Sequence, residues 1–143
     1  MIDWTNAEAM VSAHFSVEEC LLLHTWRRLA DETDVLDDTV KANLVQACGV
    51  FDKVRDFLGL PMLVHSIYRP AAYSTLVGGS GHDVHTLGLA IDFDLGPAMS
   101  IEDAKAKLEP KLEEFNIRME KGTTTWIHLD IRAPGPSGRY FTP

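Results

Sequence analysis

Hydrophobic residues recur every three or four positions between Val40 and Leu58, a spacing that predicts an amphipathic helix. The stripe comprises Val40, Leu44, Ala47, Phe51, Val54 and Leu58. Asp37 or Asp38 can cap the start of this helix, because negative charge is favoured at helix N-termini. Gly59 supplies a stop signal at the other end.

Two further helices are predicted from their N-terminal residues. Ser16 and Glu19 have the spacing of a capping box, and the segment Cys20–Leu29 that follows is expected to continue as helix. Ser100 can cap another helix, in which Pro110 must cause a kink, a split or a new first turn.

The remaining apolar segments are short and rich in β-branched and aromatic residues, which predicts strands. They are Met62–Tyr68, Leu87–Leu95, Ile117–Glu120 and Trp126–Ile131. The segment 71–81 is expected to be a loop, and the tail 133–143 is expected to be irregular. This order predicts one α+β domain over residues 1–143, with a small antiparallel sheet flanked by the N-terminal helices.

Charge and hydropathy narrow the range of partners. The 143 residues carry a formal net charge of −8, which opposes binding to the phosphates of nucleic acid. No apolar stretch approaches the roughly 20 residues of a membrane span, so membrane insertion is not expected. The first ten residues lack the pattern of a signal peptide, which predicts synthesis in the cytoplasm. A monomer is expected.

The second half of the chain contains three residues of the kinds that bind metals. His85 and Asp92 are seven residues apart, and His128 follows on the last predicted strand. Two imidazoles and one carboxylate are a common ligand set for catalytic zinc (Zn²⁺). His128 shares a strand face with Asp130, which suits either a site or the solvent-facing side of an antiparallel sheet. A loop pair formed by His82 and His85 is another possibility.

Several motifs, in order, resemble the zinc peptidases of the M15 family. They are Ser66-Ile-Tyr-Arg69-Pro70, Tyr73-x-x-x-Val77-Gly78-Gly79-Ser80, His85-x-x-Gly88-x-Ala90-x-Asp92 and Trp126-x-His128-x-Asp130. That family includes D-Ala-D-Ala carboxypeptidases and phage endolysins that cut L-alanyl-D-glutamate bonds. Its fold is related to that of hedgehog signalling domains. The resemblance therefore implies a hedgehog/DD-peptidase-like fold.

The same resemblance implies roles for individual residues. The zinc ligands would be His85, Asp92 and His128, and the residues that contact substrate would be Arg69, Ser80 and Asp83. Arg69 would hold a carboxylate or a carbonyl oxygen, a task that suits the planar fork of a guanidinium. The alternative for Arg69 is a structural salt bridge.

The sequence departs from the family at the position of the general base. The best-studied carboxypeptidases have Glu or Asp three residues before the last ligand, whereas this chain has Thr125. Threonine cannot accept a proton from water at neutral pH, so another group must do so. Asp130 and Glu120 are the carboxylates available on the neighbouring predicted strands. Asp130 is the first choice as catalytic base, and its alternative role is to orient a histidine.

The resemblance implies a peptidase that cleaves peptidoglycan stem peptides, as a D,D-carboxypeptidase or an L-alanyl-D-glutamate endopeptidase. The alternatives are a metal-binding module without catalysis and a phage structural component with a vestigial site. A phage or prophage origin, with release to the cell wall by other means, is expected from the absence of a visible signal peptide.

Overall fold

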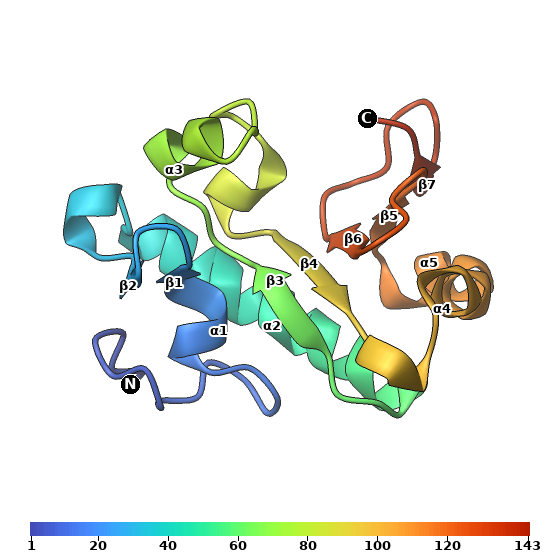
Figure 1. The fold of residues 1–143 in the computed structure, drawn as a ribbon, viewed down its shortest axis with the longest axis horizontal. Helices are drawn as coiled ribbons and strands as arrows, with labels where there is room; N and C mark the ends of the chain where they lie inside the picture. Colours follow the sequence, from blue (N-terminus) through green and yellow to red (C-terminus); the bar gives the residue numbers. More distant parts are fainter.

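The centre of the molecule is a five-stranded sheet with the strand order β3–β4–β6–β5–β7 (Figure 1). The computed structural model describes residues 1–143. The strands are β3 (Leu63–Ser66), β4 (Ala90–Asp94), β5 (Arg118–Glu120), β6 (Ile127–Asp130) and β7 (Tyr140–Phe141). Neighbouring strands are antiparallel except β5 and β7, which are parallel. The α+β class is thus confirmed, but the sheet is mixed rather than wholly antiparallel.

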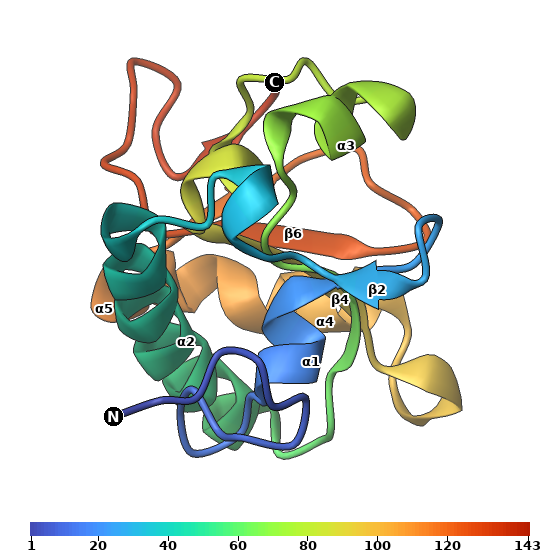
Figure 2. The same cartoon turned by 90° about the vertical axis from the view of Figure 1, so that its left-hand side faces the viewer.

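Helices cover the two faces of the sheet unequally. The α-helices are α1 (Val17–Leu21), α2 (Asp38–Leu58), α3 (Ala71–Leu76), α4 (Ile101–Leu108) and α5 (Leu112–Phe115). The 3₁₀ turns are η1 (Glu32–Asp34), η2 (Val84–Leu87), η3 (Gly96–Ala98) and η4 (Glu109–Lys111). Figure 2 shows α1, α2, α4 and α5 on one side of β6, with α3 on the other. The sheet therefore has one thickly covered face and one more open face.

The longest helix, α2, forms as its apolar stripe predicts. The carboxylate of Asp37 accepts a hydrogen bond from Val40 N at 2.9 Å, and Gly59 ends the helix with φ of 71°. All six residues of the stripe are buried. None of the helices has the length and hydropathy that a membrane span requires.

Residues on the three inner strands alternate between the two faces of the sheet. One face consists of apolar side chains that are fully buried: Ile91, Phe93, Met119, Ile127 and Leu129. They join a core of 29 buried residues that includes the stripe of α2. Because successive strand residues point to opposite faces, the polar residues between them must lie together on the open face.

Three local expectations are wrong, and the structure gives a reason for each. The helix that begins after Ser16 ends at Leu21, where the chain turns into a ribbon of β1 (Leu22–Leu23) and β2 (Arg28–Leu29). The segment 71–81 contains α3, which starts directly after Pro70. The tail contains β7, which forms because the outer edge of β5 is open to pairing. The ribbon and α3 also contact each other, because Thr25 N in the turn of the ribbon donates to the Tyr73 hydroxyl at 3.1 Å.

The C-terminal helical region follows its sequence signals. Ser100 caps α4 by accepting a hydrogen bond from Asp103 N at 3.0 Å. Pro110 lies in η4, so the helical segment is split into α4 and α5 rather than continuing. This region packs against the apolar face of the sheet through Ala104, Leu108 and Leu112, which are buried.

Gly88 ends η2, the turn that contains His85, at the point where this turn packs against α2. Its φ is +74°, and a Cβ at this position would lie 3.1 Å from Leu44 Cγ and 3.2 Å from Val40 O. We predict that Gly88→Ala lowers the free energy of unfolding by at least about 1–2 kcal/mol, the cost of a left-handed alanine. Urea unfolding monitored by circular dichroism measures this change.

Gly49→Ala is the matched control within α2. No atom lies within 4 Å of a Cβ at Gly49, so alanine should stabilise the helix by about 0.5–1 kcal/mol. Equal stability changes for the two variants would contradict both the left-handed conformation of Gly88 and its close approach to α2.

Candidate metal centre

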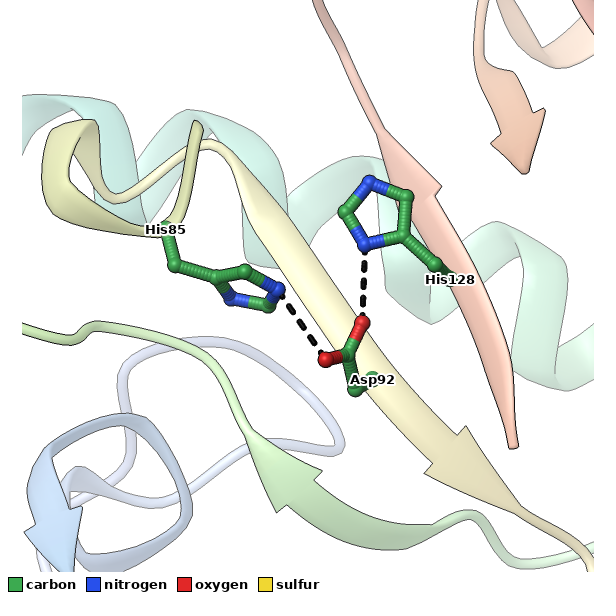
Figure 3. Close-up of side chains that lie close together, drawn as sticks. All are labelled: His85, Asp92 and His128. Carbon is green, nitrogen blue, oxygen red and sulfur yellow. Dashed lines mark hydrogen bonds and ion pairs between the residues drawn. The ribbon is translucent and has the colours of Figure 1, made fainter. Parts of the chain in front are cut away.

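Three side chains that are distant in the sequence converge on the open face of the sheet (Figure 3). His85 Nε2 lies 3.1 Å from Asp92 Oδ2, and His128 Nδ1 lies 2.8 Å from Asp92 Oδ1. One ligand atom from each residue falls within 4.8 Å of the other two. His85 comes from η2, Asp92 from β4 and His128 from β6, and the last two are directly opposite each other across the strands.

His85 is held in one orientation with a nitrogen directed at the site. Its Nδ1 lies 2.9 Å from the carbonyl oxygen of Ile67. Because a carbonyl oxygen only accepts hydrogen bonds, Nδ1 carries the proton, and a neutral ring then has its lone pair on Nε2. Nε2 is buried and has no hydrogen-bond partner, although it faces the Asp92 carboxylate. A lone pair facing a carboxylate oxygen is the arrangement that a cation between them would stabilise.

His128 lies between two carboxylates. Its Nδ1 contacts Asp92, and its Nε2 lies 3.0 Å from Asp130 Oδ2. Burial opposes the charged ring, but the hydrogen bonds with Asp130 and Asp92 outweigh it and raise the pKa of His128 to about 9. Burial likewise opposes ionisation of Asp92, yet the hydrogen bond with His128 holds its pKa well below the usual range. Without a metal, a proton on His128 balances the two carboxylates.

Asp130 is fully buried and is bound on both oxygens. Arg118 Nε lies 2.8 Å from its Oδ1, and Arg118 Nη2 lies 2.9 Å from its Oδ2. Burial disfavours the charged carboxylate, but His128 and Arg118 lower the pKa of Asp130 to about 2. Of the two roles considered for Asp130, these contacts favour that of orienting His128.

Arg118 is a site residue that the sequence analysis missed. It lies on β5, where it alternates with the buried residues Ile117 and Met119. A charged residue at such a position needs a partner, because burying an isolated charge is costly. This alternation was the available signal, but the identity of its partner depends on the register Arg118↔Asp130.

The three converging residues suit a divalent metal ion. Two imidazole nitrogens and a carboxylate are ligands that zinc accepts, and three protein ligands leave a coordination position free. The atoms that would hold it are His85 Nε2, His128 Nδ1 and an oxygen of Asp92. The Nε2–H of His128 could then donate to Asp130, an outer contact that fixes the orientation of a ligating imidazole.

A cleft of about 480 Å³ lies over these residues. Its other lining side chains include Arg69, Glu120, Trp126 and Arg132. A second hollow of about 230 Å³ shares Arg69, Val77 and Asp92 with the first and extends toward β3. Two hollows therefore border both Asp92 and Arg69.

Arg69 lies between the two hollows, close to two carboxylates but not tightly bound by either. Its Nη2 is 3.9 Å from Asp83 Oδ1 and 4.0 Å from Asp92 Oδ2. Its Nε is buried without a hydrogen-bond partner. The backbone N of Arg69 donates to His85 O at 3.1 Å, so this arginine and the first histidine are positioned together. The guanidinium thus keeps donors for another acceptor.

The structure separates the other candidate residues. Asp83 lines the cleft, but its carboxylate accepts hydrogen bonds from Ser74 Oγ and, at 3.0 Å, from His85 N. Burial raises the pKa of Asp83, and these hydrogen bonds together with Arg69 lower it below its usual value. Ser80 and His82 are exposed and lie outside the cleft lining. The structure therefore does not bring Ser80 to the site.

Fold and site together define an α+β protein with a buried His–Asp–His group suited to a divalent metal. The profile of the family described as peptidase M15 matches residues 13–130, so the chain belongs to this family. The family is one of metallopeptidases that act on peptidoglycan. Comparisons with curated proteins and with solved structures gave no match.

We predict that the protein binds one zinc ion per chain and is stabilised by it. A ligand present at 100 times its Kd raises the free energy of unfolding by about 2.7 kcal/mol. His85→Ala should lose most of this stabilisation, because it removes a ligand nitrogen. Thermal unfolding with zinc and with a chelator, together with metal analysis, measures the effect.

His14→Ala is the control for this experiment. His14 pairs with Asp56 at 2.7 Å on the surface and takes no part in the site. If zinc stabilised the His85 and His14 variants equally, the metal would bind somewhere other than this group.

Proposed function

We propose that this protein is a zinc-dependent peptidase that cleaves the stem peptides of peptidoglycan. The observation that carries the proposal is the convergence of His85, Asp92 and His128, with His85 Nε2 left without a hydrogen-bond partner. Membership of the peptidase M15 family supplies the reaction class.

The residues around the cleft have separate tasks in such a reaction. Zinc, when bound, would polarise a carbonyl group and make water acidic enough to act as a nucleophile near neutral pH. Arg69 would donate hydrogen bonds to a carboxylate or to the oxygen on which negative charge develops. Arg118 and Asp130 would keep His128 in position.

The shape of the cleft bears on the bond that is cut. A carboxypeptidase must accommodate a chain end on one side of the scissile bond, whereas an endopeptidase accommodates chain on both sides. The two hollows that border Asp92 offer space for more than a single chain end. This favours cleavage of the L-alanyl-D-glutamate type over D,D-carboxypeptidase activity.

The second candidate is a metal-binding module without catalysis. It is favoured by Thr125, which occupies the position of the family's usual base but carries no carboxylate. Thr125 is also exposed and does not line the cleft. Digestion of purified muropeptides, with mass spectrometry of the products, separates the two candidates. Products would support the peptidase, and intact muropeptides with zinc-loaded protein would support the module.

We predict that Arg69→Ala retains zinc but lowers kcat/KM for muropeptide cleavage by roughly 10²–10³-fold, as for loss of a group that stabilises an oxyanion. The reason is that Arg69 would contact the substrate rather than the metal. Steady-state cleavage rates and metal analysis on the same preparation measure both properties.

Arg55→Ala serves as the control, because Arg55 lies on α2, on the opposite side of the sheet. If Arg69→Ala instead lowers the stability of the protein, and the fraction that remains folded and zinc-loaded cleaves muropeptides at the wild-type rate, Arg69 forms a structural salt bridge with Asp83.

A further inference from the structure

Four side-chain carboxylates line the cleft, and three of them have hydrogen-bond or ion-pair partners. Asp92 contacts both histidines, Asp130 is bound by Arg118 and His128, and Asp83 is bound by Ser74 and by the backbone of His85. The fourth carboxylate, that of Glu120, has neither a hydrogen bond nor an ion pair. A group that receives and returns a proton needs a lone pair that is not already committed.

Glu120 lies in the same row of the sheet as the converging residues. The pairing of β5 with β6 extends to Met119↔Leu129, and the same antiparallel register continued by one residue brings Glu120 level with His128. Directly opposite residues share a face, with Cβ atoms roughly 4.5–5.5 Å apart. Glu120 is half-buried and lines the cleft, so its carboxylate is accessible from the space above Asp92.

The position of Glu120 complements that of Arg69. Arg69 follows β3, at one side of the strands that carry Asp92 and His128, and Glu120 lies on β5 at the other side. A substrate carbonyl above the site would therefore have a hydrogen-bond donor on one side and a proton acceptor on the other. Such opposed groups are what hydrolysis of an amide requires.

We propose that Glu120 is the general base of this protein, in place of the carboxylate that Thr125 does not supply. The proposal rests on the peptidase function proposed above. It assigns the catalytic proton transfer to a strand residue next to the last histidine, not to a residue in the turn that precedes it.

In this reaction one proton moves from water to Glu120 and then to the leaving nitrogen. The O–H bond of the attacking water breaks, its proton goes to a carboxylate oxygen of Glu120, and its oxygen bonds to the carbonyl carbon. The carbonyl π electrons move to the carbonyl oxygen, beside Arg69. They return as the C–N bond breaks, and the proton on Glu120 passes to the leaving nitrogen. The products are one carboxylic acid and one amine.

Glu120→Gln tests this role, because glutamine has nearly the same shape but cannot accept the proton. The control is Glu109→Gln, an exposed residue in η4 that does not line the cleft. We expect both variants to hold zinc like the wild type. We expect muropeptide cleavage to fall by roughly 10²–10⁴-fold for Glu120→Gln only.

A binding measurement provides a readout that does not depend on the substrate. Acetohydroxamic acid binds zinc as its anion, and a neighbouring carboxylate can accept the proton that it releases. Calorimetric titration of the zinc-loaded proteins should show affinity at least about tenfold weaker for Glu120→Gln, because a charge-assisted hydrogen bond is lost. Glu109→Gln should match the wild type.

The outcomes separate this inference from the broader proposal. Unchanged acetohydroxamate affinity and unchanged cleavage in Glu120→Gln would overturn the role of Glu120 while leaving the peptidase in place. Weaker acetohydroxamate binding, with no cleavage even by the wild type, would support Glu120 as proton acceptor and reject the stem-peptide substrate. Failure of the wild type to bind zinc would overturn both.

Discussion

The site depends on a chain of buried charge contacts that runs across the sheet from Arg118 through Asp130 and His128 to Asp92. Each of these charged side chains is buried away from water, which is costly unless the neighbouring side chain carries the opposite charge. Deleting one partner of such a pair typically costs about 3–5 kcal/mol, because the other charge is left uncompensated. The contacts thus hold His128 with one nitrogen toward Asp130 and the other toward Asp92.

This chain of contacts is possible because the sheet has two chemically distinct faces. Strand geometry sends alternate residues to opposite sides, so the apolar residues of β4, β5 and β6 fill the core against the helices. The intervening residues must then meet one another on the open face. Antiparallel pairing of β4 with β6 places Asp92 opposite His128, although they are 36 positions apart in the chain.

His85 reaches the site in a different way, on the turn η2, which is hydrogen-bonded to the residues that follow β3. Two hydrogen bonds connect the end of β3 with η2: Ile67 O accepts from the His85 ring, and Arg69 N donates to His85 O. The first sets the tautomer of His85 and the second keeps Arg69 beside it. The close packing of Gly88 against α2 also fixes the position of η2.

The features that were predictable from the sequence are those with strong local patterns. The stripe of α2, the caps Ser16, Asp37 and Ser100, and the alternation on the strands that carry Asp92 and His128 all have local physical causes. The family resemblance added the set of candidate ligands, and the family membership is confirmed.

The features that were not predictable depend on tertiary contacts. The segment after Leu21 has helical composition, but it forms the β1–β2 ribbon, whose turn donates from Thr25 N to the hydroxyl of the distant Tyr73. The strand β7 contains only two residues and exists because β5 offers an unpaired edge. The partner of Arg118 could not be known without the strand register, so Asp130 was the first choice for proton transfer, ahead of Glu120.

The difference between Asp130 and Glu120 illustrates a general constraint on sites of this kind. Contacts that make a carboxylate a good orienting group occupy its lone pairs and lower its pKa, as Arg118 and His128 do for Asp130. The same contacts make it a weak proton acceptor, because a base works best with a pKa near the operating pH. One carboxylate therefore cannot easily fill both roles, and a site that uses Asp130 to fix His128 needs a second, uncommitted carboxylate. On this sheet, the row that contains Asp92 and His128 continues to β5, and Glu120 is the carboxylate that it reaches.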